Sequence, residues 1–253
     1  MRQLLASIVL GGASLAVHAQ TPDIARMEPP FWWAGMQHAQ VQLMVYGDKI
    51  ADLDPSLAYP GVRIASVTRT PNRNYLFIDL ALDPKVKPGS FEIAFKGANR
   101  SASYTYRLLE REAGSAERQG FSSKDAIYQI MPDRFANGDP SNDSVEGMPD
   151  KLDRKGGLGR HGGDIKGIID RLDYVAGMGF TQLWPTPLVE NNMPGYSYHG
   201  YAATDLYKID PRYGSNEDFV RLSTEAKKRG IGIIQDVVLS HIGSHHWWMR
   251  SEE

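Results

Sequence analysis

The spacing of hydrophobic residues changes near residue 115, and this change constrains the fold more than any other feature of the chain. Upstream, hydrophobic residues recur at every second position, as at Val41, Leu43 and Val45. Downstream, continuous hydrophobic runs alternate with segments in which hydrophobic residues recur every three or four positions. The first pattern is typical of half-buried strands, and the second is typical of parallel strands joined by helices. The 253 residues therefore predict two domains of different fold class.

Residues 20–110 are predicted to form an all-β, immunoglobulin-like sandwich. Further strand-like runs occupy residues 75–80, 91–95 and 104–108. Gly, Pro and Asn separate these runs, and short strands at such spacing are typical of small antiparallel sandwiches. Residues 111–120 are charged or small and show no hydrophobic period, so we interpret them as a linker.

The remainder of the chain, residues 121–253, shows the order β-α-β-α-β. Continuous hydrophobic runs predict three strands, at residues 126–130, 181–184 and 231–239. A helix between the first two strands is predicted from the spacing of Ile165, Ile168, Ile169, Leu172, Val175 and Ala176. Ser215 and Asp218 have the spacing of a capping box, which predicts the start of a second helix.

The first 19 residues resemble an export signal. Arg2 supplies a positive start, residues 4–17 form a mostly hydrophobic run, and Val17 and Ala19 place small residues at the cleavage positions. The run is shorter than the ~20 residues that a membrane-spanning helix requires, and no later run is long enough. We therefore expect no membrane span, and we expect export to a bacterial periplasm or to the extracellular space.

Composition excludes several classes of function. The chain contains no cysteine, so disulfides, thiolate metal sites and cysteine nucleophiles are excluded. Its net charge is −2, so no basic excess is present to neutralise phosphates. Nucleic acid is therefore not an expected partner.

Oxygen-bearing side chains gather after the first predicted strand. Asn137, Asp139, Asn142 and Asp143 lie within seven residues, and hard cations such as Ca²⁺ bind six to eight oxygen atoms. The same residue types are also common in ordinary turns. Asp164 precedes the first predicted helix, where it is well placed as an N-cap. The residues alone leave both interpretations open, a turn with an N-cap or a metal site.

A second polar group follows the later strands. The loop after residue 184 contains His199 between Tyr198 and Tyr201, and such rings suit stacking on a sugar as well as local packing. Asp236 interrupts the third hydrophobic run, where a carboxylate is costly unless it is paired or functional. His241 follows the end of that run. The carboxyl ends of parallel barrel strands are the usual place for catalytic and binding residues.

Taken in order, the motifs of the second half resemble the α-amylase family of glycoside hydrolases. The resemblance is carried by Ala126-Ile127-Tyr128-Gln129-Ile130 with Asp133-Arg134-Phe135, by Asn137-Gly138-Asp139, by Gly162-Gly163-Asp164, by Tyr198-His199-Gly200-Tyr201 and by Asp236 through His241. It is strongest to the neopullulanase and cyclomaltodextrinase branch, whose members carry a β-sandwich before the barrel. The resemblance implies that residues 121–253 are the first part of a (β/α)₈ TIM barrel, with about three of eight strands, in an N-terminal fragment.

The resemblance also implies a role for each polar group. It implies a structural calcium ion bound by Asn137, Asp139, Asn142, Asp143, the Gly162 carbonyl and Asp164. It implies sugar contacts from His199, Tyr201, Asp236 and His241. One departure is Ser240, where the family usually has Asn in a different calcium site, so that site is not assigned. The Gly-x-Arg-x-Asp pattern of the family's nucleophile is absent, so no catalytic residue is assigned within this chain.

Two functions are compatible with these residues. The first is an α-glucan hydrolase, acting on maltooligosaccharides, cyclodextrins or pullulan with retention, of which this chain is an inactive fragment. Retaining glycosidases need two carboxyl groups about 5 Å apart, and the chain offers only one near its sugar-binding residues. The second is a non-catalytic α-glucan-binding protein. The resemblance further implies that the full-length enzyme forms a homodimer through its N-terminal domain.

Overall fold

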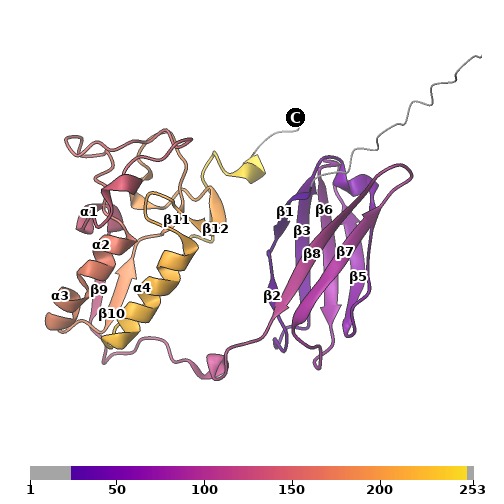
Figure 1. Cartoon of the computed structure of the whole chain (residues 1–253), viewed down its shortest axis with the longest axis horizontal. Coiled ribbons are helices and arrows are strands. Elements are labelled where there is room, and N and C mark those ends of the chain that lie inside the picture. Colours follow the sequence, from indigo (N-terminus) through magenta and orange to yellow (C-terminus); the bar gives the residue numbers. More distant parts are fainter. Residues whose placement is uncertain (1–23, 250–253) are drawn as a thin grey trace, which may run out of the picture. The chain divides into compact units, whose positions relative to one another are not determined.

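The computed structural model describes residues 24–249 and divides them into two compact units, with the boundary between Arg118 and Gln119. The expected export signal, residues 1–19, lies outside the described residues. Figure 1 shows the strands and helices of the two units. Each unit has its own cluster of buried hydrophobic side chains. Within residues 24–249, no helix combines the length and the hydrophobicity needed to cross a bilayer.

The first unit consists of two four-stranded sheets. One sheet has the order β1 (Ile24–Glu28), β3 (Gln40–Gly47), β6 (Tyr75–Leu82) and β5 (Val62–Arg69). The other has the order β2 (Trp32–Trp33), β8 (Ser101–Leu109), β7 (Gly89–Lys96) and β4 (Asp54–Leu57). Neighbouring strands are antiparallel, except that β2 runs parallel to β8. Two short 3₁₀ turns, η1 (Ile50–Asp52) and η2 (Ser115–Glu117), complete the chain up to the boundary.

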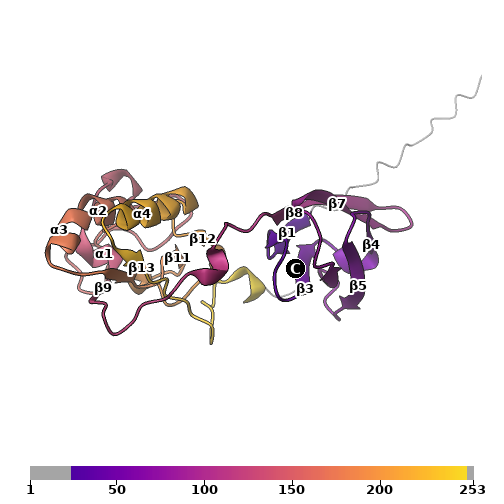
Figure 2. The same cartoon turned by 90° about the horizontal axis from the view of Figure 1, so that it is seen from below.

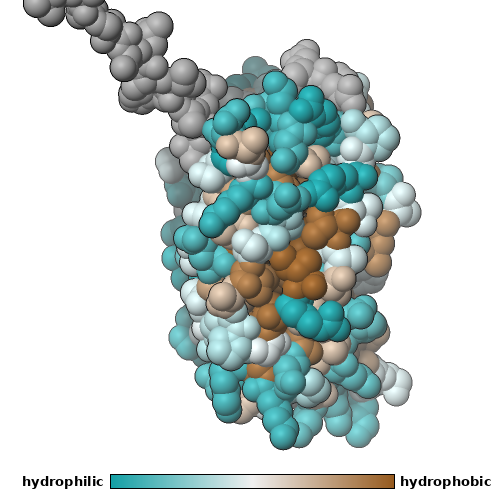
Figure 3. Space-filling view, turned by 90° about the vertical axis from the view of Figure 1, so that its right-hand side faces the viewer, coloured by the Kyte–Doolittle hydropathy of each residue, from teal (hydrophilic) through white to brown (hydrophobic). Residues whose placement is uncertain are grey.

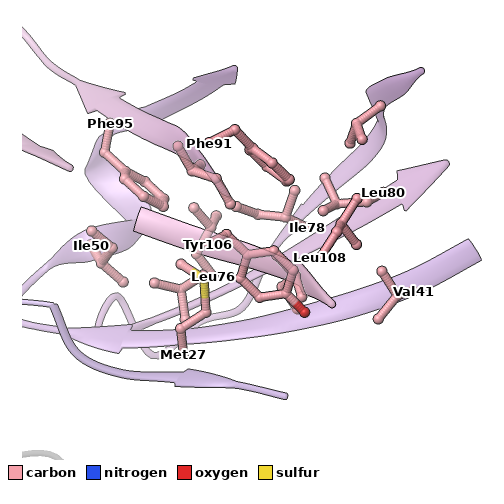
Figure 4. Close-up of a cluster of buried hydrophobic side chains, with 14 of the residues drawn as sticks. Met27, Val41, Ile50, Leu76, Ile78, Leu80, Phe91, Phe95, Tyr106 and Leu108 are labelled. Atoms are coloured by element: carbon pink, nitrogen blue, oxygen red, sulfur yellow. The ribbon is translucent and has the colours of Figure 1, made fainter. Parts of the chain in front are cut away.

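Alternate side chains of both sheets meet in a shared core. Leu76, Ile78 and Leu80 of β6 are buried, as are Ile93 and Phe95 of β7. Figure 4 shows side chains from both sheets pointing into the same interior. Each such side chain contributes about 1.5–3 kcal/mol by leaving water. The predicted sandwich is therefore confirmed, and the period of two in the sequence reflects one buried face per sheet.

The two edge strands β4 and β5 contact each other on one side of this unit. Leu57 of β4 and Ile64 and Val67 of β5 are only partly buried there, and they pack against the core. Figure 3 shows a hydrophobic stripe on this side, bordered by hydrophilic residues.

The second unit is built on a parallel sheet of the order β13-β10-β9 (Gly232–Ile233, Gln182–Pro185, Ile127–Ile130). An antiparallel pair, β11 (Val189–Glu190) and β12 (Asp205–Ile209), lies in the connection after β10. The helices are α1 (Pro132–Phe135), α2 (Ile165–Asp170), α3 (Leu172–Gly177) and α4 (Asn216–Lys228), with 3₁₀ turns η3 (Pro140–Asn142), η4 (Ser197–His199) and η5 (Trp247–Met249).

Helices α2, α3 and α4 cover one face of the sheet, as Figure 2 shows. Ile168 of α2, Leu222 of α4 and Leu183 of β10 are fully buried in the core of this unit. The predicted capping box is present, since Ser215 accepts a hydrogen bond from the Asp218 N–H and Asp218 accepts one from the Ser215 N–H.

The first predicted helix is divided in the structure into α2 and α3. Arg171, with φ −114° and ψ 8°, separates the two short helices. Hydrophobic spacing alone does not reveal this break, because the residues on both sides of it still face the same core.

The third predicted strand is shorter than expected. The run 231–239 predicts a long strand, whereas β13 covers Gly232–Ile233. The Ile234 N–H still donates to Leu183 O, but the following residues are not in a strand. Val237 is 56% exposed and Leu239 is 92% exposed. In the described part of the chain β13 pairs with β10 alone, so nothing holds these later residues in extended pairing.

Candidate functional site

Four of the polar residues singled out by the sequence form one connected cluster beyond β10 and β13. Tyr201 Oη donates a hydrogen bond of 2.9 Å to Asp236 Oδ2. His241 Nε2 lies 2.8 Å from the Tyr201 carbonyl oxygen, which it reaches as a donor. The Tyr201 N–H donates to His199 Nδ1 at 2.9 Å. The structure therefore brings together residues from two separate segments of the chain.

Trp184 is a further member of this cluster that the sequence reasoning did not single out. Its indole Nε1–H donates to Asp236 Oδ2 at 3.0 Å. Trp184 belongs to β10, next to the last residue of that strand. The signal available in the sequence was its place at the carboxyl end of a hydrophobic run, where barrel proteins carry their functional side chains. Two donors thus hold the Asp236 carboxylate in place.

The rings of His199 and Tyr201 stack on each other. Their centroids are 5.8 Å apart with 25° between the planes. Burial lowers the pKa of His199 below its ordinary value, and its Nδ1 acts as an acceptor, so the neutral ring carries its proton on Nε2. Burial raises the pKa of Tyr201, and the hydrogen bond to Asp236 raises it further. Both rings are therefore uncharged at neutral pH and present partly exposed aromatic surface.

Two left-handed residues shape the turn that carries these rings. Tyr196 has φ 58° and Gly200 has φ 85°, so η4 is bounded by positive φ at both ends. A Cβ atom at position 200 would overlap the Pro187 carbonyl oxygen. Glycine is required at this position for both its conformation and its small size.

The oxygen-rich loop after β9 forms a second, separate group of polar atoms. Asn137 Nδ2 donates to Asp143 Oδ1 at 2.6 Å. Gly162, with φ +85°, lies so close that a Cβ atom there would overlap Asp143 Oδ1. The amide oxygens of Asn137 and Asn142 are buried and have no hydrogen-bond partner within residues 24–249. Buried acceptors without a donor are costly, and a cation is one partner that satisfies them.

The carboxylates of the other two predicted metal ligands, Asp164 and Asp139, accept hydrogen bonds from this loop. Asp164 is the N-cap of α2, and its two carboxylate oxygens accept from the N–H groups of Gly138, Asp139 and Gly167. Asp139 accepts from the hydroxyl and the N–H of Ser141, which hold its pKa below the ordinary value. No group of three or more His, Cys, Asp or Glu residues within the described range is arranged to hold a metal. Of the predicted ligands, Asn137 and Asn142 thus have unsatisfied amide oxygens, and the Asp143 carboxylate lies beside Gly162.

Both units match known protein families. Residues 26–112 match the cyclomaltodextrinase N-terminal domain, and residues 129–253 match the α-amylase catalytic domain. The second unit belongs to the α-amylase family. This confirms the expected order of a β-sandwich followed by the first strands of a barrel. Members of the α-amylase family are glycoside hydrolases that act on α-glucans, and relatives of this chain include a neopullulanase.

The matched relatives are considerably longer than this chain. Neopullulanase 2 of Thermoactinomyces vulgaris is 38% identical over 167 residues, covering 65% of this chain and 25% of the relative. The periplasmic α-amylase of Escherichia coli K12 is 36% identical over 151 residues, covering 54% and 22%. A crystal structure of an Anoxybacillus α-amylase is 44% identical, with a TM-score of 0.45, covering 49% and 26%. The chain thus spans about a quarter of the length of these α-amylase relatives.

Proposed function

We propose that this chain supplies part of the sugar-binding cleft of a glycoside hydrolase that acts on α-1,4-glucans, namely maltooligosaccharides, cyclodextrins or pullulan. The observation that carries the proposal is the connected cluster of Tyr201, Asp236, His241 and His199 beyond the carboxyl end of β10. The exposed face of the Tyr201 ring stacks on a glucose ring, and the Asp236 carboxylate and the His241 imidazole bind its hydroxyl groups. The neutral pair of aromatic rings avoids the cost of burying a charge beneath the sugar.

The chain by itself binds glucan without hydrolysing it. Retaining hydrolysis requires a carboxylate nucleophile and a carboxylic acid about 5–5.5 Å apart. In the described part of the chain, Asp236 is the carboxylate that contacts the cluster, and Tyr201 and Trp184 hold it as a hydrogen-bond acceptor. One carboxylate cannot act as nucleophile and acid across the same bond.

Calorimetry with β-cyclodextrin and maltoheptaose tests this proposal. We expect the purified chain to bind at least one of them, and we expect Tyr201→Ala to weaken binding by about tenfold or more. Tyr174→Ala is the matched control, because Tyr174 is exposed on α3 and lies outside the cluster. Equal affinity of the wild type and Tyr201→Ala would contradict the proposed site.

A measurement of turnover distinguishes the second candidate, a non-catalytic α-glucan-binding protein, from the first. Both candidates allow binding by this chain. Reducing-sugar release by the purified chain that is lost in Asp236→Asn would show that a catalytic pair is present and would contradict our proposal. Activity that appears only when the chain is extended downstream, through the remaining barrel strands, would favour the hydrolase over the non-catalytic protein.

We also propose that the oxygen-rich loop binds one Ca²⁺ ion. The two unsatisfied amide oxygens of Asn137 and Asn142 support this, together with the carboxylate of Asp143. Bound calcium would satisfy these amide oxygens and would add to the ion pair that Asp143 forms with Arg154 at 3.3 Å. Because a ligand that binds only the folded state stabilises it, the chain should melt at a higher temperature in calcium than in chelator. Asn142→Ala should remove that difference, whereas Asn99→Ala, an exposed change in the first unit, should keep it.

Export and dimer formation stay proposals as well. Export is supported by the pattern of residues 1–19, and a periplasmic α-amylase is among the relatives. Cell fractionation after expression with the native N-terminus tests the location. Dimer formation of the full-length protein rests on the resemblance of the first unit alone, and sedimentation of that protein tests it.

A further inference from the structure

The turn that carries His199 and Tyr201 starts at a serine whose hydroxyl lies between two charged groups. Ser197 is 1% exposed and is the first residue of η4. Its Oγ donates to Asp150 Oδ2 at 2.8 Å and accepts from Arg160 Nη1 at 3.0 Å. Its N–H donates to the same Asp150 oxygen at 2.9 Å. One side chain thus links the turn to two distant points of the chain.

The backbone of the turn is held from other sides as well. Asn191 Nδ2 donates to the Ser197 carbonyl oxygen at 3.2 Å, and Tyr213 Oη donates to the Tyr198 carbonyl oxygen at 2.8 Å. The Arg160 guanidinium lies over the Tyr213 ring at 4.8 Å from its centroid. Arg160 and Tyr213 are each 1% exposed. The turn is therefore fixed by buried polar contacts, which are more directional than hydrophobic packing.

The Arg160 guanidinium depends on Ser197 for its hydrogen bonding. Its Nε and Nη2 atoms have no hydrogen-bond partner in the described part of the chain, and Asp133 Oδ1 lies 3.9 Å from Nε. Removing the Ser197 hydroxyl would deprive a buried cation of the acceptor that it contacts at 3.0 Å. Asp133 and the Tyr213 ring would remain beside the guanidinium, but neither accepts a hydrogen bond from it in the described part of the chain. A buried cation that loses its hydrogen-bond acceptor is destabilising, so the guanidinium or the turn would have to move.

We propose that Ser197, clamped between Asp150 and Arg160, is a positioning residue that holds the His199–Tyr201 ring pair in place against Asp236. The expected effect on sugar affinity rests on the proposed function, whereas the placement of the two rings does not. The contacts of Ser197 with Asp150 and Arg160 lie at the start of the turn, and His199 and Tyr201 follow two and four positions later. Displacing the turn moves both rings and weakens the bond from Tyr201 to Asp236.

The test compares Ser197→Ala with Ser215→Ala in the full chain. Both variants lose one serine hydroxyl from the second unit, but Ser215 caps α4, and its hydroxyl and N–H bond to Asp218. In Ser197→Ala we expect the imidazole pKa of His199, followed by NMR, to shift upward as the ring becomes more exposed. We also expect the affinity for β-cyclodextrin to fall about tenfold. Ser215→Ala should lower Tm and leave both quantities unchanged.

A second pair of variants keeps the proposal testable if Ser197→Ala does not fold. Asp150→Asn keeps an oxygen acceptor for the Ser197 N–H and hydroxyl, whereas Asp150→Ala removes it. We expect the His199 pKa to stay close to its wild-type value in Asp150→Asn and to shift upward in Asp150→Ala. If Ser197→Ala and both Asp150 variants titrate at His199 like the wild type, the clamp does not position the rings. Absence of β-cyclodextrin binding by the wild type would count against the proposed function and would leave the titration test intact.

Discussion

His199 can hold its place in the turn only while it is neutral. Its Nδ1 accepts a hydrogen bond from the Tyr201 N–H, so a proton on Nδ1 would set two donors against each other. The aromatic rings of Tyr198 and Tyr201 lie beside the His199 ring. Burial lowers the pKa of the imidazole below its ordinary value, which favours the neutral form.

We expect stability to fall on the acid side because of His199. Burial lowers its pKa in the folded state, whereas the unfolded chain titrates near the ordinary value of about 6.5. Below that pH the unfolded state binds more protons than the folded state, so the free energy of unfolding decreases as pH falls and levels off above about 6.5. Urea unfolding of the wild type and of His199→Gln, compared from pH 7.5 to 5, checks this. The variant should show a smaller loss, and identical slopes would contradict the assignment.

Gly200 should tolerate no side chain. Its φ of 85° and the overlap of a Cβ atom with the Pro187 carbonyl oxygen act together, so Gly200→Ala should cost at least about 2 kcal/mol of unfolding free energy. Gly195→Ala, in the same connection, is the matched control, since a Cβ atom there meets nothing within 4 Å. Denaturant titration should leave the control within about 0.5 kcal/mol of the wild type. Equal losses in the two variants would show that the strain at position 200 is relieved.

At the scale of single elements, α4 is the longest helix of the second unit's described part, and both its start and its buried face follow local rules. The capping box of Ser215 and Asp218 satisfies N–H groups at its N-terminus, and Lys227 and Lys228 lie in its last turn. Leu222 and Ala226, four positions apart, are fully buried. The helix therefore combines a capped N-terminus with one buried hydrophobic face.

Removing the cap should destabilise the second unit without changing its fold. We expect Ser215→Ala to cost about 1 kcal/mol, because the Asp218 N–H loses its acceptor. Ser223→Ala, an exposed change in the middle of the same helix, should be neutral or slightly stabilising, since Ala is the better helix former. Thermal melts followed at 222 nm check the difference in sign between these two substitutions.

At the scale of the whole molecule, the two units have separate hydrophobic cores, one between two sheets and one between a parallel sheet and its helices. No residue belongs to both clusters. Because cooperativity follows shared packing, we expect two unfolding transitions in the chain.

The first unit should fold when residues 24–118 are expressed alone. We expect a β-type far-UV spectrum and a cooperative melt within about 5 °C of the corresponding transition of the full chain. Leu43→Ala, at a fully buried position, should lower the free energy of unfolding of this unit by about 2–5 kcal/mol. The transition of the second unit should be unchanged. A helical spectrum, or a melt without cooperativity, would contradict the division into independent units.

The sequence alone determined the features that depend on near neighbours. Alternation at Leu76, Ile78 and Leu80 identified a strand with one buried face, because side chains in a strand point to opposite sides in turn. The spacing of Ser215 and Asp218 identified a helix start, since a capping box is closed within four residues. The candidate sugar-binding residues came from the resemblance of ordered motifs to the α-amylase family, because the residues by themselves left local packing open.

Which distant groups meet depends on the tertiary structure. Ser197 contacts Arg160 and Asp150 across 37 and 47 positions, and neither separation leaves a periodic trace in the sequence. The Asp164 carboxylate accepts hydrogen bonds from the N–H groups of Gly138 and Asp139. Counting oxygen-bearing side chains in the sequence does not reveal these contacts. The third strand ends at Ile233 because extended residues need a paired neighbour, and pairing is a property of the assembled sheet.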